Sequence, residues 1–349
     1  MKKFVGRLFG VLSEDMGIDL GTSNTLICVK NKGIILTEPS VVTINSKTKD
    51  IVEIGEKAKQ QMGRLPIGFE TKKPLQNGVI SEYEITEKML RLFLKRVKRG
   101  SFSSPRIVLC VPAGVTPVEK RAVTEVAIEA GAREAYLVEE PMAAGIGIGL
   151  DIFEPEGHMI VDIGGGTAEI AVLALGGIVE KSSFRVAGDK FDAAIVDYIR
   201  SKDNLLIGIK SAEEIKKQIG AVVEQDEKDD VYVEISGKNI MTGLPKNIPV
   251  YSSEIVEALG EIVQQIVEEI KVILERTPPE LASDIKKKGI YVTGGGALLK
   301  GIDKKISDSL EIKVTIPDDP LDAVINGIHT ILKDFGKYKR VLVSPETDY

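Results

Sequence analysis

Residues 17–25 read Gly-Ile-Asp-Leu-Gly-Thr-Ser-Asn-Thr, and residues 160–167 read Ile-Val-Asp-Ile-Gly-Gly-Gly-Thr. In each stretch an apolar run reaches an aspartate and then a glycine turn that carries hydroxyl groups, and a second apolar run follows. Apolar runs on both sides of a tight glycine turn are typical of a β-hairpin. Two such hairpins in one chain predict two homologous half-domains that hold a single ligand between them.

Both turns have the chemistry that a nucleotide phosphate requires. Turn glycines allow backbone N–H groups to approach a polyanion, and the threonine and serine hydroxyls add further donors. Asp19 and Asp162, at the strand ends, suit a Mg²⁺ ion held through its waters, since Mg²⁺ usually takes one or two carboxylates together with phosphate oxygens. One Asp-x-Gly turn alone is common and would only cap its own loop, so the prediction depends on the ordered pair. The predicted phosphate-binding residues are Gly21, Thr22, Ser23, Asn24, Gly164, Gly165, Gly166 and Thr167.

A third glycine segment, residues 289–302, extends the pattern. Here a β-like run enters three glycines, and an apolar-periodic stretch that predicts a helix follows directly. Free N–H groups at a helix N-terminus can receive phosphate or ribose oxygens. The predicted nucleotide-binding residues of this segment are Gly294, Gly295, Gly296 and Ala297.

The three glycine segments, in this order, resemble the phosphate-1, phosphate-2 and adenosine motifs of the actin, Hsp70 and sugar-kinase ATPase superfamily. Its two linking motifs also have counterparts: residues 111–113 with 139–144 resemble connect-1, and residues 319–327 resemble connect-2. Several stretches resemble, more specifically, the sequences of the MreB family of bacterial actins. These stretches are residues 19–25, 139–144, 162–167 and 278–284, and the resemblance runs from about residue 4 to about residue 335.

This resemblance implies an α/β protein with the actin-like ATPase fold, in which two homologous ribonuclease-H-like domains each carry a smaller inserted subdomain. Domain I would comprise residues 1–150 and about 325–349, with its small subdomain at about 36–78. Domain II would comprise residues 151–324, with its small subdomain at about 190–250. The length agrees, because 349 residues exceed what one hydrophobic core usually supports.

Periodicity predicts the main outer elements. Apolar positions recur at helical spacing over residues 84–98 and 253–276, and residues 117–130 form a third predicted helix, which opens at a proline and closes at a glycine. Continuous or alternating apolar runs predict strands at residues 106–111 and 231–235.

The resemblance also assigns roles to individual side chains. Glu140, just before the helix that would join the two domains, matches the residue that orients the attacking water in actin-like folds, and Thr167 would assist it. Glu213 and Lys216 match the acidic residue and the lysine that meet the ribose and the base. Each has a simpler alternative: a glutamate before a proline can cap its helix, and Glu213 with Lys216 can form a solvated i,i+3 ion pair.

Composition and charge argue against several other classes of protein. Hydrophobic content of 43% with 28% charged residues is ordinary for a globular protein, and a net charge of −6 gives no drive toward nucleic acid. Cys28 and Cys110 lie in apolar runs and are expected to be reduced core residues. The two histidines, His158 and His329, have no zinc-ligand spacing. Without an 18-residue apolar stretch or a signal-peptide pattern, we expect a cytoplasmic location.

The first twelve residues indicate contact with a membrane surface. They carry three cations, and as a helix they would gather Phe4 and Phe9 on one side, which suits the boundary of an anionic leaflet. A second candidate is Phe102, in a loop that follows a cluster of lysines and arginines between residues 88 and 99. The alternative for the N-terminal segment is a disordered tail or a staple onto the domain.

The function implied by the resemblance is that of a slow ATPase, which converts ATP to ADP with Mg²⁺ and forms filaments on the inner face of the cytoplasmic membrane to organise wall synthesis. GTP in place of ATP is an alternative nucleotide. Expected partners are other copies of the chain in antiparallel protofilament pairs, with Val118 and the region of Ser283 in the flat contact, an anionic membrane, and MreC, MreD and RodZ. The alternative is a soluble ATPase of the superfamily or a sugar kinase, although we find neither a peptide-binding domain nor an acceptor-binding insertion.

Overall fold

The computed structural model describes residues 14–98, 104–224 and 230–343. The proposed membrane contacts Phe4, Phe9 and Phe102 lie outside these residues. Along the described chain no helix has both the length and the apolar character that a membrane crossing requires.

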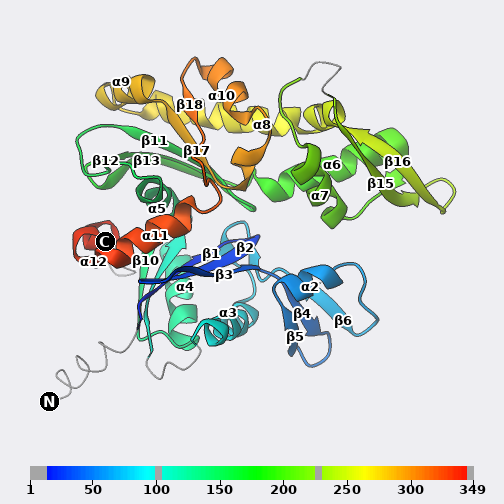
Figure 1. The fold of residues 1–349 in the computed structure, drawn as a ribbon, viewed down its shortest axis with the longest axis horizontal. Helices are drawn as coiled ribbons and strands as arrows, with labels where there is room; N and C mark the ends of the chain where they lie inside the picture. The colour runs from blue at the N-terminus through cyan, green and yellow to red at the C-terminus, as the bar shows by residue number, and fades with distance from the viewer. Residues whose placement is uncertain (1–13, 99–103, 225–229, 344–349) are drawn as a thin grey trace.

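Two five-stranded sheets form the centre of the molecule (Figure 1). The first has the order β10-β9-β1-β2-β3 and the second the order β18-β17-β11-β12-β13, so each strand of one sheet has a counterpart in the other. In both sheets the central hairpin, β1–β2 or β11–β12, is antiparallel. The two strands next to its first strand, β9 and β10 or β17 and β18, run parallel to that strand. The predicted hairpins and the α/β class are confirmed. The first sheet consists of β1 (Met16–Leu20), β2 (Asn24–Val29), β3 (Gly33–Pro39), β9 (Arg106–Val111) and β10 (Glu134–Glu139). The second consists of β11 (His158–Ile163), β12 (Ala168–Ala174), β13 (Gly177–Phe184), β17 (Ile290–Thr293) and β18 (Val314–Thr315).

Helices cover both faces of each sheet, which explains why the central strands are nearly continuous apolar runs. Outside the first sheet lie α3 (Tyr83–Val97) and α4 (Pro117–Glu129), and outside the second lie α8 (Ser252–Arg276), α9 (Pro279–Lys288) and α10 (Ile302–Leu310). The three predicted helices agree with α3, α4 and α8 to within one residue at each end. Thr116 and Glu119 form a capping box that starts α4, with Pro117 at its first position.

Two helices fill the space between the sheets: α5 (Glu140–Gly147) packs on β11 and β12, and α11 (Ala323–Lys333) packs on β1, β2 and β9. They cross at glycines, because a Cβ atom at Gly327 would overlap the carbonyl oxygen of Ala143, and one at Gly147 would overlap that of Ala323. Each half has its own cluster of buried apolar side chains. A third cluster, which includes the free and buried thiols Cys28 and Cys110, surrounds the crossing of α5 and α11. The two halves are therefore joined through backbone contact.

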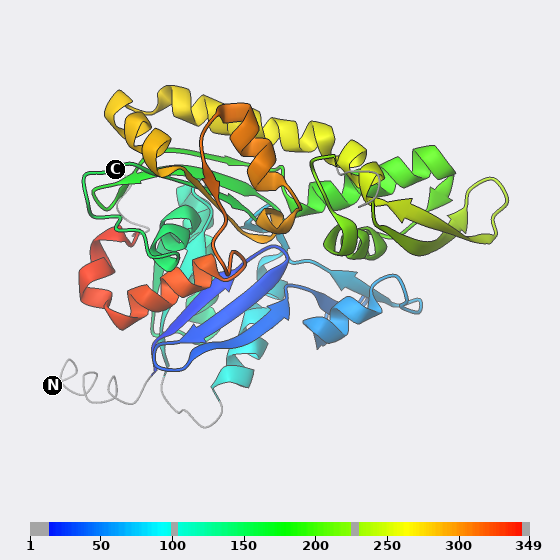
Figure 2. The same ribbon diagram turned by 45° about the horizontal axis from the view of Figure 1, so that its top comes forward.

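Two small sheets project on the same side of the molecule (Figures 1 and 2). One has the order β5-β4-β6 with α2 beside it, and the other has the order β14-β15-β16 with α6 and α7 beside it. They fall within the stretches expected for the inserted subdomains, but the domain boundaries themselves stay a prediction. The bounds are β4 (Val42–Asn45), β5 (Ile51–Ile54), α2 (Glu56–Gln61), β6 (Phe69–Lys72), α6 (Gly188–Asp203), β14 (Leu205–Leu206), α7 (Ile209–Ile219), β15 (Tyr232–Asn239) and β16 (Pro245–Tyr251). The remaining short elements are β7 (Leu75–Gln76), β8 (Val79–Ile80), α12 (Phe335–Tyr338) and the 3₁₀ helix Lys339–Val341.

The prediction of a helix directly behind the third glycine segment was wrong. Residues Gly295–Leu298 form a short 3₁₀ helix, and α10 starts only at Ile302. The chain is interrupted because the backbone of Lys300 pairs with that of residues 220–222, and Gly301 then takes a left-handed conformation with φ of 82°. A long-range backbone contact thus overrides the local helical pattern.

The helix crossing yields a prediction about stability. Gly327→Ala should lower the thermal unfolding midpoint strongly, by the equivalent of about 3 kcal/mol or more, because the new methyl group would meet the backbone of Ala143, which cannot move aside. Gly260→Ala, in the middle of α8 with open space around the glycine, is the matched control and should raise stability by about 0.5–1 kcal/mol. An unchanged midpoint for Gly327→Ala would contradict the close crossing.

Candidate functional site

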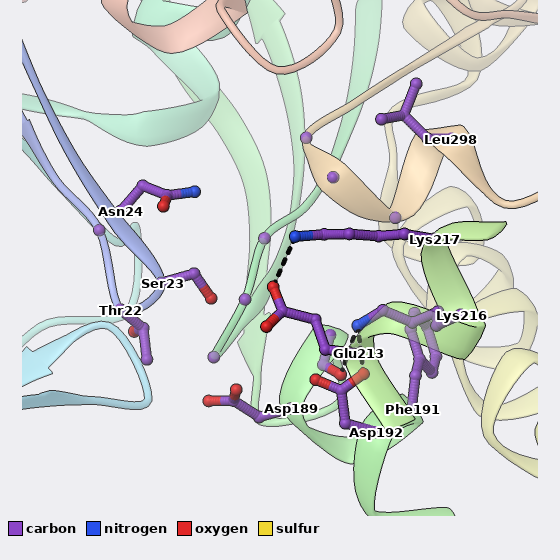
Figure 3. A pocket seen from close by; sticks show the side chains of 18 of the residues that line it. Thr22, Ser23, Asn24, Asp189, Phe191, Asp192, Glu213, Lys216, Lys217 and Leu298 are labelled. Carbon is purple, nitrogen blue, oxygen red and sulfur yellow. Dashed lines mark hydrogen bonds and ion pairs between the residues drawn. The ribbon is translucent and has the colours of Figure 1, made fainter. Parts of the chain in front are cut away.

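A cavity of about 560 Å³ lies between the two halves, with walls from both large sheets and both small subdomains. In Figure 3 the β1–β2 turn forms one wall, and α6, α7 and the segment at Leu298 form the other. Nearly all predicted site residues line it: Asp19, Gly21, Thr22, Ser23, Asn24, Glu140, Asp162, Gly164, Gly165, Gly166, Thr167, Glu213, Lys216, Gly294, Gly295 and Gly296. Ala297 does not line the cavity, because it is buried in the apolar core behind the glycine turn.

The two hairpin turns face each other at very short range. A Cβ atom on Gly165 would overlap the side chain of Ser23, and one on Gly166 would overlap the hydroxyl of Thr22. The Thr22 hydroxyl also accepts a hydrogen bond from the Gly78 N–H at 2.9 Å. Only glycines fit where the turns meet, which leaves their N–H groups accessible to an anion.

The two strand-end aspartates lie on the floor of the cavity, as expected for a shared cation. Cys110 donates its thiol hydrogen to Asp19 Oδ1 at 3.1 Å, and Thr293 donates its hydroxyl to Asp162 Oδ1 at 2.7 Å. Burial raises the pKa of Asp19 to about 6, and the neighbouring negative charge of Asp162 adds to that rise. Burial also raises the pKa of Asp162. Two oxygen-donor carboxylates that destabilise each other's charge fit a divalent cation, which would relieve both.

Glu140 is the first residue of α5 and lines the cavity beside the aspartates. Burial, followed by the charges of Glu169, Asp19 and Asp162, raises the pKa of Glu140 well above its usual value. The helix-cap alternative does not describe it, because the N-cap residue is Glu139, whose carboxylate pairs with Lys181 at 2.8 Å. Glu140 thus holds a proton more tightly than an ordinary glutamate does.

Sequence reasoning assigned no role to Glu169, although it is a fully buried carboxylate of the same cluster. It accepts hydrogen bonds from the Ser183 hydroxyl at 2.7 Å and from the Ala113 N–H at 3.0 Å. Burial outweighs these donors and raises the pKa of Glu169 to about 7. The signal was present in the sequence: a single acidic residue inside the otherwise apolar run 168–174.

The predicted base and ribose residues lie at the cavity but are engaged in ion pairs (Figure 3). Glu213 pairs with Lys59 of the opposite small subdomain at 2.8 Å and with Lys217 at 2.6 Å. Burial alone would raise the pKa of Glu213, but these two lysines lower this pKa to about 2. Lys216 instead pairs with Asp192 at 2.7 Å, so the alternative of an i,i+3 pair between Glu213 and Lys216 was wrong.

The cavity also has a partly apolar rim and a second ionic link. Leu298 and Leu321 are more than half exposed beside the third glycine segment, where a flat apolar ligand group could pack. Lys73 pairs with Asp189 at 2.9 Å, from one small subdomain to the other half. Among the described residues, no group of three or more His, Cys, Asp or Glu side chains is arranged to hold a metal by itself.

Comparisons with known proteins point to one family. The family model described as MreB/Mbl protein matches residues 13–340. The chain is 47% identical to the cell shape-determining protein MreB of Escherichia coli strain K12, over 94% of each chain. It is 44% identical to the cell shape-determining protein Mbl of Bacillus subtilis, over 94% of this chain and 98% of the relative.

Solved structures show the same fold. The crystal structure of MreB5 of Spiroplasma citri bound to ADP has a TM-score of 0.89 and 37% identity, and covers 94% of this chain and 98% of that one. The same protein bound to AMPPNP gives equal values. The MamK double helical filament, at 23% identity and a TM-score of 0.76 over 93% of this chain and 99% of that one, adds that the fold extends to more distant actin-like proteins. The expected actin-like ATPase fold is confirmed.

The raised pKa of Asp19 yields a prediction about pH. Because the folded, ligand-free protein holds this proton more tightly than the unfolded chain does, the contribution of Asp19 to stability is full below about pH 4. It is lost as the pH rises through about 6. A shift of about two pKa units corresponds to about 3 kcal/mol. Asp19→Asn removes this loss. In EDTA, the thermal midpoint of the variant minus that of the wild type should therefore be several degrees larger at pH 8 than at pH 5.

The control for this measurement is Asp318→Asn, an exposed aspartate outside the cavity, which should track the wild type at both pH values. If Asp19→Asn also tracks the wild type, Asp19 does not carry a raised pKa in the folded protein.

Proposed function

The chain belongs to the MreB/Mbl family, and on that premise we propose that it is an ATP-dependent, filament-forming protein of the bacterial cytoskeleton. In this proposal it hydrolyses ATP slowly, assembles on the inner face of the cytoplasmic membrane, and organises wall synthesis and cell shape. The observation that carries the nucleotide part is the cavity in which two glycine turns face each other and which Asp19 and Asp162 also line. The domain division given above, at about residues 150 and 324, belongs to the same proposal.

The phosphates of ATP would bind at the two turns, through the N–H groups of Gly165 and Gly166 and the hydroxyls of Thr22 and Ser23. The N–H groups of Gly21 and Gly164 instead donate to the carbonyl oxygens of Asn24 and Thr167 and so shape the two turns. Asp19 and Asp162 would hold the hydrated Mg²⁺, which neutralises phosphate charge when bound. That the Spiroplasma citri relative binds ADP and AMPPNP supports this placement. The apolar rim at Leu298 would take the purine, and nothing in this rim selects adenine over guanine.

For the ribose and the hydrolytic water, the structure offers charged groups at suitable places. Glu213 stays ionised through its two lysines and keeps lone pairs that can accept ribose hydroxyls. The Lys216 ammonium, held by Asp192 and by the carbonyl oxygen of Gly188 at 3.0 Å, would face the base side. Glu140 would orient the attacking water and take its proton, a role that suits a carboxyl whose pKa burial has raised. Thr167 would complete the water site.

Hydrolysis gives the most direct test. Glu140→Ala should leave Mg-ATP affinity nearly intact and reduce phosphate release by about 10- to 1000-fold, the usual range for loss of one positioning or proton-handling group. Asp162→Ala should instead weaken Mg-nucleotide binding itself. Affinity from a fluorescent ATP analogue and phosphate release measured in parallel separate the two effects. Unchanged turnover in Glu140→Ala would remove this residue from the mechanism.

Two strongly exposed apolar side chains are candidates for assembly contacts. Val118 at the start of α4 is 73% exposed, and Met241 at the β15–β16 turn is 78% exposed. Head-to-tail contacts of one surface with a different one generate open filaments. Val118 lies where the family resemblance puts the contact between antiparallel protofilaments.

Sedimentation should therefore show a concentration threshold that depends on nucleotide. Val118→Glu should prevent pairing of protofilaments while nucleotide affinity stays at the wild-type value, because the charge would be buried in the flat contact. Val179→Glu, at another exposed apolar position on β13, is the matched control. A protein that stays monomeric with ATP and lipid, yet phosphorylates a sugar, would favour the kinase alternative.

Membrane binding and the membrane partners MreC, MreD and RodZ belong to the proposal through the sequence of residues 1–12 and the family resemblance. Deleting residues 1–12, or changing Phe4 and Phe9 together to Asp, should release the protein from vesicles rich in phosphatidylglycerol while ATPase activity stays near wild type. Two buried phenylalanines contribute about 3–6 kcal/mol, and each nearby cation about 1 kcal/mol. Added salt should weaken the binding only in part. Undiminished pelleting of the truncated protein would move the anchor to Phe102 or to a partner.

A further inference from the structure

Four polar side chains form a row across the second sheet. In the strand register Thr293 of β17 is opposite Asp162 of β11, Asp162 is opposite Glu169 of β12, and Glu169 is opposite Ser183 of β13. Side chains in register on neighbouring strands lie on the same face of a sheet. Thr293 donates to Asp162 and Ser183 donates to Glu169, each at 2.7 Å, so the outer hydroxyls hold the two inner carboxylates in place.

Within this row Glu169 differs from Asp162 in where it reaches. Asp162 lines the cavity, but Glu169 does not and has no exposed surface. Its second oxygen accepts the N–H of Ala113, which lies in the loop after β9 of the other sheet. One buried carboxylate is therefore bonded to both halves of the molecule, directly behind the cavity wall.

The side chain between Glu169 and the cavity is Thr167. It lines the cavity and lies two residues before Glu169, hence on the same side of the extended chain, close enough for its hydroxyl to lower the pKa of Glu169. A carboxylate accepts and does not donate, so a hydrogen bond between the two would direct the hydroxyl proton of Thr167 at Glu169. The lone pairs of the Thr167 oxygen would then be available to the cavity, where they can accept a hydrogen bond from a water molecule.

We propose that Glu169 is a positioning residue for nucleotide hydrolysis, which fixes the Thr167 hydroxyl as an acceptor for the attacking water. Through Ala113 this orientation also depends on the contact between the two halves. The inference rests on the proposed ATPase function and extends it to a residue that never touches the nucleotide.

The first sheet supplies a comparison inside the same molecule. There Asp19 has Cys110 on one side, through the thiol hydrogen bond, and Leu26 opposite it on β2. Leu26 thus occupies the place that Glu169 has in the second sheet. Both hairpins carry the aspartate, but only the second has a carboxylate opposite it in the strand register. In this proposal the second half therefore orients the water.

The test uses the full-length protein and a double-mutant cycle. Glu169→Gln keeps the shape but presents an amide N–H₂ group, which donates where the carboxylate accepted. We expect single-turnover ATP hydrolysis to fall about 10- to 100-fold, with Mg-ADP affinity within about threefold of wild type. In a Thr167→Val background the same change should have less than a twofold further effect, because its action passes through the missing hydroxyl. Glu261→Gln, an exposed site on α8, is the charge-matched control and should behave as wild type.

Ser183→Ala provides a second variant that leaves Glu169 itself in place and decides the matter if Glu169→Gln fails to fold. Loss of the hydrogen bond to Glu169 should slow hydrolysis about three- to tenfold in the wild type and not at all in Thr167→Val. Wild-type hydrolysis with no effect of either variant, or effects that multiply with Thr167→Val, would overturn the role of Glu169 and leave the proposed function standing. A wild-type protein without nucleotide hydrolysis would overturn both.

Discussion

The arrangement of this molecule depends on keeping four carboxylates close together at the seam between its two halves. Asp162 and Glu169 are buried at this seam, and Asp19 and Glu140 are half-buried there. Ionised groups are costly in such surroundings, and like charges raise one another's pKa values. Within the described part of the chain, these carboxylates accept hydrogen bonds from one thiol, two hydroxyls and one backbone N–H. A bound cation is the natural complement, so the site is built where the protein without ligand is least stable.

The rest of the fold offsets that strain. Each half has its own apolar core, and the third cluster around α5 and α11 joins them where glycines bring the two backbones into contact. Because this crossing lies immediately beside the carboxylates, the angle between the halves and the separation of the two aspartates are set by the same few atoms. The duplicated sheets supply the symmetry of the site, while its chemistry is unequal, with Leu26 on one side and Glu169 on the other.

Much of the fold could be predicted from sequence because its signals are local. The two glycine hairpins, the capped helix α4 and the long helix α8 each carry their own pattern, and the glycines of the turns follow directly from the close approach they permit. The misses were long-range. The pair of Lys59 with Glu213 joins residues 154 positions apart, and the 3₁₀ helix after Gly294 results from backbone pairing with residues 220–222. Neither contact leaves a trace in the surrounding sequence.

The links across the mouth of the cavity are of a different kind from those at the seam. Lys59–Glu213 and Lys73–Asp189 are partly exposed, with side-chain exposures between 22% and 41%, and pairs of this kind contribute little to stability. The seam, by contrast, is held by fully buried contacts that cannot slide without cavities or clashes. If the two small subdomains separated, these ion pairs would therefore break at a lower cost than the packing of α5 against α11. In the role proposed for Glu169, its hydrogen bond with Ala113 would make the water site depend on the contact between the two halves and not on the ion pairs at the mouth.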